Sequence, residues 1–496
     1  MITFFISLCL LIIGYVFYSR LTEKVFVIDD RLTPAMEKAD GIDITPLPKW
    51  KAFLIELLNI AGTGPIFGAI SGALFGPIAF IWIVLGCILG GAVHDYFSGM
   101  ISSRNGGESI VSISGKYLGK VMEVVMRVFS IVLLILVTAV FVVSPSSLLT
   151  TLFNGKVNII IFMSIILLYY FLSTIVPIDK IIGRAYPVFG VILILMAVMI
   201  IVGLMIKHDE YPMIELFGNF KDFSSSNNSL PWWPFMFTTI ACGAVSGFHA
   251  TQSPMIAKCI KSEKEGRQVF YGAMVAEGII ALIWAAAAMA FYHIDTAEGW
   301  QALNLIGGNS NSVHEIAKSV LGTFGTILAV VGVVICPITS GDTALRSTRL
   351  ILGESFKLDQ KVLKNRLILT FPLFAIIVAI SIWDFMAVEN FNILWRWFAW
   401  SNQTLAAIAL WCGTAYILKE NKNKISSLFT GIPATFMTFV VVNYILSEPN
   451  IALGKFVPSS IAFIISLIAV LLIFAFYIFK LLKILKSNNI QIKNGK

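Results

Sequence analysis

The feature that most constrains this chain is a succession of apolar runs, each about 20 residues or longer, separated by short polar connections. A helix of that length matches the hydrocarbon thickness of a membrane. The 496-residue chain is 57% hydrophobic and only 13% charged, a composition typical of membrane proteins. We therefore expect an all-α polytopic membrane protein. The thirteen expected spans are 2–19, 52–73, 77–100, 121–143, 158–176, 187–206, 232–256, 268–292, 316–340, 367–383, 391–417, 428–446 and 457–480.

The distribution of positive charge predicts how the chain is oriented in the membrane. Of the 36 lysines and arginines, 29 fall in alternate connections or in the tail from Lys480, and four fall in the opposite connections. Because positively charged loops stay in the cytoplasm, we expect the N-terminus outside and the C-terminus inside. The net charge of +8 therefore reflects the orientation of the chain in the membrane. The basic residues do not form one patch, so the charge does not indicate nucleic acid binding.

Two of the apolar runs contain residues that are unfavourable in a continuous membrane helix. Residues 60–65 read Ile-Ala-Gly-Thr-Gly-Pro, and residues 242–254 read Cys-Gly-Ala-Val-Ser-Gly-Phe-His-Ala-Thr-Gln-Ser-Pro. Glycine and proline weaken the helical hydrogen-bond ladder, and hydrocarbon cannot satisfy the polar side chains. Both runs are therefore expected to be broken helices that line a cavity. The alternative is a tightly packed helix that is kinked at glycine.

The spacing of the two breaks predicts an internal symmetry. They lie 181 residues and five expected spans apart, and a repeat of five helices must be inverted relative to its copy. We expect a core of two inverted five-helix repeats, residues 52–206 and 232–417. Residues 1–51 add one helix and a cytoplasmic loop, which is interpreted as a solvated linker because its charges nearly cancel. Residues 428–496 add two helices and a basic cytoplasmic tail.

Several motifs resemble those of a known family. They are Ile60 to Pro65, Gly91 to Tyr96 with Ser103-Arg104 and Gly107 to Ile110, Cys242 to Pro254, Tyr271 to Met274 with Glu277-Gly278, Thr339 to Ala344, and Trp395-Arg396 with Trp400 to Gln403. Together they span almost the whole expected core and resemble the carbon starvation protein A family. The resemblance implies a transporter of the amino acid/polyamine/organocation superfamily in the bacterial cell membrane, with a leucine-transporter-like core. It further implies uptake of peptides or pyruvate, no enzymatic activity, and no cofactor beyond a coupling ion, H⁺ or Na⁺.

The broken segments supply most of the candidate substrate-binding residues. Half-helices leave backbone amides and carbonyls free near the middle of the membrane, and nearby polar side chains can hydrogen-bond a small substrate. Arg396, on the last core helix, can hold a carboxylate through two parallel bonds. Alternatively, Arg396 extends toward the membrane surface within an aromatic belt. The candidate substrate-binding residues are Ala61, Gly62, Thr63, Gly64, Ser246, His249, Thr251, Gln252 and Arg396.

Residues 339–343, Thr-Ser-Gly-Asp-Thr, are candidates for ion coupling. In a leucine-transporter-type fold, which the resemblance implies, hydroxyls of this helix complete a sodium site beside the first broken helix. Thr339, Ser340 and Thr343 offer oxygen atoms that suit a hard cation. Asp342 adds a group that can carry a proton. The alternative is a carboxylate at the cytoplasmic end of the helix, paired with Arg346.

Three more ionisable residues lie inside expected spans and are also candidates for coupling. His94 and Asp95 are adjacent and could form a proton relay or a gating pair. Glu277 lies among Ala, Ile and Trp, where it could bind a proton or a cationic group. The alternative for Asp95 is a structural ion pair with Arg104, Arg127 or Arg396. For Glu277 it is a structural ion pair with Arg127 or Arg396. Two other glutamates are expected to be solvated near inner helix ends, Glu56 and Glu123.

The six cysteines predict neither disulfides nor a metal site. They lie in or beside apolar runs and show no Cys-x-x-Cys spacing. We therefore expect the partners of this chain to be a small-molecule substrate and the lipid bilayer.

Other functional classes fit the sequence less well. An intramembrane serine protease is suggested by Ser246-Gly247, but position 244 is Ala, so the Gly-x-Ser-Gly pattern fails. A channel has no need of inverted broken helices. A sensor without transport activity would usually carry a soluble output domain, and no connection is long enough to hold one. The sequence therefore predicts a secondary active importer of a small carboxylate-bearing nutrient, with amino-acid transport as an alternative; oligomeric state cannot be read from it.

Overall fold

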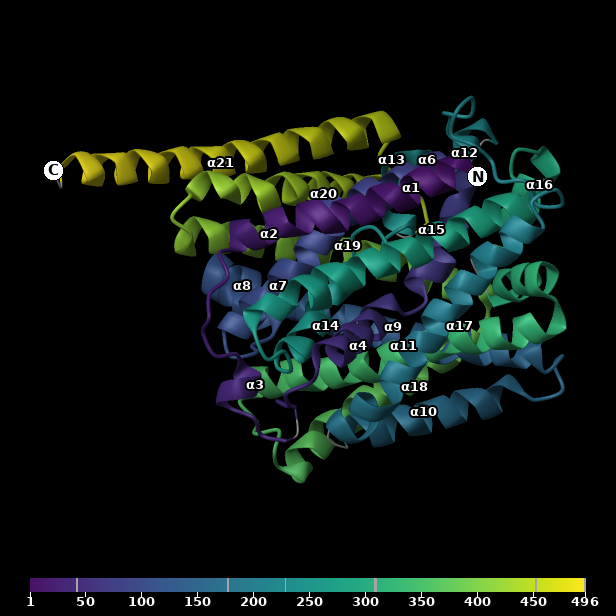
Figure 1. The fold of residues 1–496 in the computed structure, drawn as a ribbon, viewed down its shortest axis with the longest axis horizontal. Helices are drawn as coiled ribbons and strands as arrows, with labels where there is room; N and C mark the ends of the chain where they lie inside the picture. Colours follow the sequence, from purple (N-terminus) through teal and green to yellow (C-terminus); the bar gives the residue numbers. More distant parts are fainter. Residues whose placement is uncertain (42, 176–177, 228, 307–309, 451–452, 495–496) are drawn as a thin grey trace.

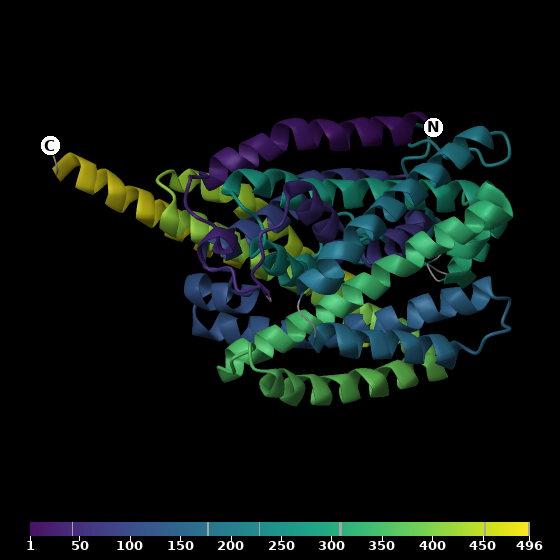
Figure 2. The same cartoon turned by 60° about the horizontal axis from the view of Figure 1, so that its bottom comes forward.

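The chain folds into a bundle of long helices. The computed structural model describes residues 1–496 apart from 42, 176–177, 228, 307–309, 451–452 and 495–496. All regular secondary structure in this described part is helical. Figures 1 and 2 show the long helices lying roughly along one direction. α1 (Ile2–Ile13) begins at one end of the bundle, and α21 (Ser459–Asn494) carries the C-terminus past the opposite end.

The helices are long and apolar enough for a multi-pass membrane protein. Among the described residues, nine of them can cross a membrane, and a bent pair, Lys49–Ala61 with Gly64–Phe75, forms a tenth candidate with an angle of 58° between its parts. The nine are Ile2–Phe26, Ile78–Arg104, Lys120–Leu152, Ala185–Ile206, Glu263–Tyr292, Gly325–Phe356, Leu363–Met386, Lys424–Ser447 and Ser459–Ser487.

Helical segments also occupy the remaining expected spans. α10 (Ile159–Ile175) is shorter, α19 (Val388–Glu420) is more polar, and α13 (Trp232–Thr239) is separated from α14 (Gly247–Ala257) by residues 240–246. The other helices have the following bounds: α2 Ser19–Phe26, α3 Pro34–Glu37, α4 Lys49–Ala61, α5 Ala69–Gly72, α6 Ile78–Leu85, α7 Ala92–Arg104, α8 Ile110–Leu118, α9 Lys120–Leu152, α11 Ile178–Ile206, α12 Phe223–Ser226, α15 Gly272–Tyr292, α16 Ala297–Ile306, α17 Ser310–Phe356, α18 Leu363–Met386 and α20 Leu428–Ser447.

Several helices continue beyond the apolar runs that predicted them. α17 ends at Phe356, whereas the expected span ends at residue 340. Hydropathy marks only the part of a helix that suits hydrocarbon, while backbone hydrogen bonds continue through polar residues that are buried in protein or solvated. As a consequence, Asp342 lies inside a helix, and the alternative that places it at a helix end is wrong.

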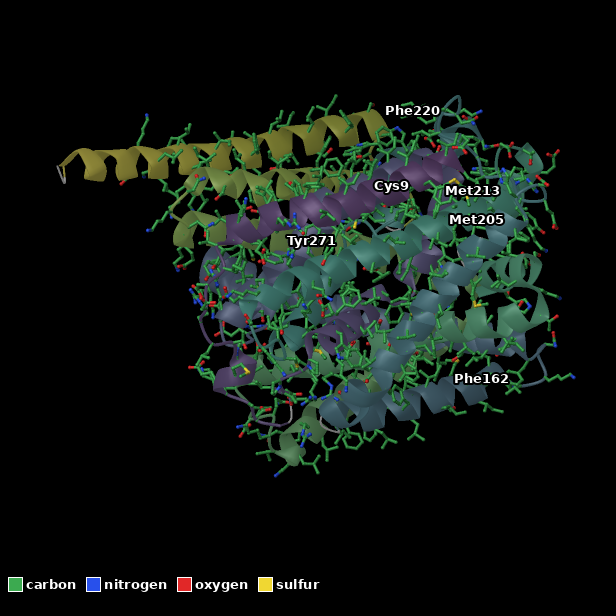
Figure 3. All side chains as sticks on the ribbon, viewed as in Figure 1. Cys9, Phe162, Met205, Met213, Phe220 and Tyr271 are labelled. Carbon is green, nitrogen blue, oxygen red and sulfur yellow. The ribbon has the colours of Figure 1, made fainter. Side chains whose placement is uncertain are left out.

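Burial separates inner helices from peripheral ones. The apolar part of the segment Glu263–Tyr292 is 83% buried, whereas that of Ser459–Ser487 is only 22% buried. α15 is rich in alanine, and small side chains let neighbouring helices approach closely. Tyr271, labelled in Figure 3 near the start of α15, donates a hydrogen bond to the carbonyl of Ile88 at 3.0 Å. Cys9, labelled on α1 in the same figure, is exposed.

The connection between α2 and α4 is not a freely solvated linker. Thr33 Oγ1 donates a hydrogen bond to the carbonyl of Ile260 at 2.6 Å, and Leu47 N–H donates to the carbonyl of Cys259 at 2.9 Å. This connection therefore packs against the chain that follows α14. Charged side chains take part as well, since Asp30 lies 2.8 Å from Lys264 and Arg31 lies 3.7 Å from Glu263. The balanced charges did not reveal these contacts, because composition does not show which groups pair.

Candidate functional site

The first break lies between α4 and η2 (Gly64–Gly68) and is held open by α17. Gly62 has φ +50°, and a Cβ there would lie 2.5 Å from the ring of Phe141, so the position requires glycine. Ser340 Oγ accepts a hydrogen bond from Gly62 N–H at 3.1 Å and donates one to the Leu58 carbonyl at 2.7 Å. One side chain of α17 thus satisfies a donor and an acceptor that the break exposes.

The second break, residues 240–246, is held in a similar way by α19. Asn402 Oδ1 accepts a hydrogen bond from Phe248 N–H at 2.6 Å, and Asn402 also hydrogen-bonds the hydroxyl of Ser246. Gln403 Nε2 donates to the Phe237 carbonyl at 2.6 Å, near the end of α13. Two adjacent amides therefore serve backbone groups on both sides of the break. Both amides belong to the motif Trp400 to Gln403, but nothing in the local sequence indicates that they face the second break.

A buried charged cluster joins α14 to α7 and α15. His249 Nδ1 donates a hydrogen bond to Asp95 Oδ2 at 2.8 Å, and His249 Nε2 lies 3.3 Å from Glu277 Oε2. His94 Nδ1 lies 2.8 Å from Asp95 Oδ1. All four side chains are fully buried. The structure therefore brings together four residues that the sequence assigned separately to substrate binding and to coupling.

The arginines proposed as partners of these acids lie elsewhere. Arg104 Nε is 2.7 Å from Glu263 Oε1, and Arg127 contacts Glu123 one helical turn away at 2.5 Å. Arg396 Nη1 is 2.9 Å from Glu448 Oε1. The alternative of a structural pair between Asp95 or Glu277 and one of these arginines is thus contradicted. Arg396 is 32% exposed and lies outside the buried cluster.

Glu56 belongs to the buried region and is not solvated as expected. Its Oε1 accepts a hydrogen bond from Ser253 Oγ at 2.7 Å, which links α4 to α14, and the residue is fully buried. A signal was present in the sequence, because Glu56, Asn59 and Thr63 have the spacing of one helix face. A polar stripe on an otherwise apolar helix points toward a protein interior rather than lipid.

Several polar atoms beside the breaks are buried without a hydrogen-bond partner among the described residues. They are the amide atoms of Asn59, the hydroxyl of Thr63 and Oε1 of Gln252. Gln252 Nε2 donates to Thr251 Oγ1 at 2.8 Å, and Thr251 Oγ1 donates to the Phe248 carbonyl at 2.6 Å. Buried polar groups are seldom left unpaired, so these atoms mark a place where a polar ligand would be favourable. Ala61 and Gly64 complete the buried wall at the first break.

Asp342 lies in a second polar cluster, formed by α17, α10 and α11. Its Oδ2 accepts hydrogen bonds from Ser173 Oγ at 2.7 Å and from Tyr186 OH at 2.7 Å, with Tyr169 OH at 3.3 Å. Its Oδ1 has no hydrogen-bond partner in the described part of the chain. The partner helices did not stand out in the sequence, because tyrosine and serine are common in membrane helices.

The neighbouring hydroxyls of α17 bond mainly within their own helix. Thr339 Oγ1 donates to the Cys336 carbonyl at 2.9 Å, and Thr343 Oγ1 donates to the Ser340 carbonyl at 3.1 Å. Ser340 is the exception, since it reaches the first break. The four candidate side chains of this motif therefore do not form one site: Ser340 bonds the break, Asp342 bonds α10 and α11, and the two threonines bond their own helix.

Two open cavities lie near the candidate residues, and the first of them reaches the second break at Val245. One, of about 690 Å³, is lined by apolar residues that include Trp82, Phe237 and Phe436. The other, of about 760 Å³, is polar and is lined by residues that include Arg104 and Tyr416. Neither lining contains a residue of the buried charged cluster. The four side chains of the buried charged cluster are thus not exposed to either cavity.

Sequence comparison relates this geometry to known proteins. The chain matches the model of the family described as "Carbon starvation protein CstA" over residues 1–221, 162–304 and 294–443. A Haemophilus influenzae protein described as an uncharacterized membrane protein is 42% identical, covering 59% of this chain and 91% of that protein. Peptide transporter CstA of Bacillus subtilis is 27% identical, covering 88% of each chain. Pyruvate/proton symporter BtsT of Escherichia coli is 27% identical, covering 56% of this chain and 47% of that protein.

Solved structures show the same overall fold. MhsT in complex with L-phenylalanine superposes with a TM-score of 0.58 at 12% identity, covering 80% of this chain and 99% of that chain. A Na⁺-coupled sialic acid symporter superposes with a TM-score of 0.56 at 11% identity, covering 94% of this chain and 95% of that chain. The leucine-transporter-like overall fold that we expected is thus shown. With the family model matching most of its length, this chain belongs to the carbon starvation protein CstA family.

Proposed function

We propose that this chain is a secondary active transporter that imports a small carboxylate-bearing nutrient, a peptide or pyruvate, by alternating access. The observation that carries the proposal is the pair of broken helices, each held by one neighbouring helix, α17 at Gly62 and α19 at residues 240–246. Breaks at membrane depth are stable only inside protein, and they supply free backbone groups to a substrate. The names of the relatives from Bacillus subtilis and Escherichia coli support the same function.

The proposal includes the finer architecture. The chain would cross the membrane thirteen times, with two inverted five-helix repeats that begin at α4 and α13. The N-terminus would lie outside and the C-terminus in the cytoplasm, in keeping with the excess of basic residues in alternate connections. The positions of the two termini at opposite ends of the bundle support an odd number of crossings (Figure 1).

We assign substrate binding to the buried region between the breaks. Asn59 and Thr63 on the first broken helix and Gln252 on the second offer buried polar atoms without partners in the described chain. A ligand that supplies these bonds would gain more than the same bonds are worth in water, because each atom has already lost its hydration. Arg396, which is bonded to Glu448, is not needed in this assignment.

We assign coupling to Asp342 and propose the proton as the coupling ion. Asp342 faces Tyr186 and Tyr169, and Arg346 lies near enough to interact with it electrostatically. A carboxylate that is surrounded by hydroxyl donors can exchange a proton as those donors move with the neighbouring helices. The proton named for the Escherichia coli relative supports this choice over sodium.

The test is uptake by purified protein in liposomes. Labelled pyruvate and a labelled dipeptide are compared under an imposed proton gradient and then under a sodium gradient. We expect one substrate to accumulate with an inward proton gradient and to stop accumulating when a protonophore is added. Accumulation driven by sodium alone would overturn the assignment of the proton. No accumulation of either substrate, or of amino acids, under verified gradients would contradict the transport function and favour a sensor.

A further inference from the structure

Three metal-ligating side chains meet at the second break. Cys242 lies within the break, His249 lies on α14, and Glu277 lies on α15. One ligand atom from each, Sγ, an imidazole nitrogen and a carboxylate oxygen, lies within 4.8 Å of the other two, and all three residues are buried. We propose that these residues form a binding site for a divalent transition-metal ion of the zinc class. This inference goes beyond the proposed transport function and does not depend on it.

The spacing of the donor atoms suits such an ion. Two atoms that are each about 2.0–2.3 Å from one tetrahedral ion lie about 3.3–3.8 Å from each other. His249 Nε2 and Glu277 Oε2 are 3.3 Å apart and thus already have this separation. The cysteine needs at most a small movement, because its sulfur is within 4.8 Å of the other donors.

Asp95 orients the histidine as a metal ligand requires. Metal-bound histidine almost always donates its other ring N–H to a carboxylate or carbonyl, which fixes the tautomer and strengthens the ligand. Here Nδ1 of His249 is 2.8 Å from Asp95 Oδ2, so Nε2 is left facing Glu277. One nitrogen of His249 is therefore held by a carboxylate, and the other is available to bind a metal ion. A histidine that served only for packing would not require this arrangement.

The hydrogen bonding and charge of the cluster also favour a cation. Neither carboxylate oxygen of Glu277 makes a well-formed hydrogen bond, and neither does Nε2 of His249. Among the described residues, the ion pairs of Asp95 and Glu277 involve only histidines. A histidine that binds a metal is neutral, so His249 would then leave buried carboxylates without its positive charge, and a divalent ion would compensate them directly.

The donor set selects the class of metal. A thiolate, an imidazole and a carboxylate suit zinc, cobalt and iron better than magnesium or calcium, which prefer oxygen alone. Three protein ligands leave a fourth tetrahedral position for a small ligand. The sequence predicted no metal site, because Cys242 belongs to no Cys-x-x-Cys pair. The three donors meet only because the break turns Cys242 back toward α15.

The test uses purified full-length protein in detergent, without any gradient, and titrates it with Co²⁺. We expect one Co²⁺ per chain, with a near-ultraviolet charge-transfer band that reports a thiolate ligand and that Zn²⁺ abolishes by displacement. Cys242→Ser should remove the band, and Glu277→Gln should weaken affinity by at least about tenfold. Asp95→Asn should weaken it by about 10–100-fold. Cys412→Ser is the matched control, because Cys412 is also buried but lies on α19.

A second measurement does not depend on the folding of any variant. X-ray absorption of zinc-loaded wild-type protein should show one sulfur ligand and two or three nitrogen or oxygen ligands. Absence of sulfur, or a charge-transfer band that persists in Cys242→Ser, would overturn the proposal. If metal binding fails while liposome uptake succeeds, only this inference is lost.

Discussion

The hydroxyl of Ser340 accepts a hydrogen bond from the backbone N–H of Gly62 at 3.1 Å, although 278 residues separate them. Through this contact α17 holds the first broken helix, and through the second bond of Ser340 it also holds Leu58. Any movement of α17 relative to α4 must break or exchange these bonds. The contact therefore couples the helix that carries Asp342 to the helix that lines the proposed substrate site.

We expect Ser340→Ala to destabilise the protein, because it leaves a buried N–H and a buried carbonyl without partners. Such a loss typically costs about 1–3 kcal/mol. The thermal unfolding midpoint in detergent should fall clearly below that of wild type. Ser381→Ala is the matched control, since Ser381 on α18 is buried but has no hydrogen-bond partner among the described residues. Equal midpoints for the two variants would contradict the role of Ser340.

Asn402→Leu is expected to abolish uptake, because Phe248 N–H and Ser246 lose their partner at the second break. Asn402→Asp should retain part of the activity, since it keeps the acceptor oxygen but loses the amide donor. Initial uptake rates in liposomes measure both. Asn443→Ala is a suitable control, because Asn443 is buried and bonds Ser466 at 2.9 Å, far from the breaks in sequence. Full activity of Asn402→Leu would show that the break does not need this amide.

Asp342→Asn should uncouple transport from the proton gradient. The variant keeps the size of the side chain but cannot alternate between charged and neutral forms, so downhill exchange should continue while accumulation is lost. Tyr186→Phe removes the hydroxyl that lies 2.7 Å from Asp342 and should shift the pH dependence of uptake. The matched control is Asp384→Asn, which changes a buried aspartate on α18. Normal accumulation by Asp342→Asn would remove this residue from the coupling step.

Arg104 and Glu263 are expected to close one end of the bundle. Two nitrogens of Arg104 contact the carboxylate at 2.7 and 2.8 Å, and Arg104 Nη1 also donates to Tyr416 OH at 2.6 Å. Removing one partner of such a buried pair costs about 3–5 kcal/mol. Arg104→Ala should therefore speed the labelling of Cys259, which is buried, by a thiol reagent.

Exchanging the two charged residues of this pair is the internal control for the proposed closing role. The double variant Arg104→Glu with Glu263→Arg should slow labelling again, at least in part. Lys116→Ala changes another basic residue in the lining of the same cavity and should have little effect. Labelling that does not differ between wild type and Arg104→Ala would show that the pair does not close this end.

The contact between Glu215 and the first residues of α1 is expected to depend on pH. Burial alone would raise the pKa of the Glu215 carboxyl, but hydrogen bonds from the N-terminal ammonium group and from Thr3 outweigh that effect and lower the pKa from 4.5 to about 2. The stabilisation of the folded state by the Glu215 carboxylate is therefore fully present above about pH 4.5 and is lost as the pH falls toward about 2.

Hydrogen exchange measures this contact directly. The amides of Ile2 and Thr3 donate to Glu215 at 2.8 and 2.7 Å, and their protection should fall across that pH range after correction for intrinsic exchange. Glu215→Gln should show weak protection already at neutral pH. Strong protection in this variant would mean that the membrane alone orders the first turn.

The sequence alone determined the class of fold and the places where the backbone breaks. Apolar runs of sufficient length can only be membrane helices, and the sequences around Gly62 and Gly243 are incompatible with continuous ones, because helix formation and its failure are local properties. The sequence also identified His249, Asp95 and Glu277 as unusual, since charged groups in apolar runs are costly wherever they lie.

Only the tertiary structure decided which groups meet. Nothing in the local sequence pairs His249 with Asp95 rather than pairing Asp95 with an arginine, or places Ser173 and Tyr186 around Asp342. The tertiary structure also decided that Glu56 is buried, that Arg396 bonds Glu448, and that Cys242 lies close to Glu277. These contacts depend on how helices far apart in the chain pack and rotate, and that is set by the shapes of many side chains together rather than by any one segment.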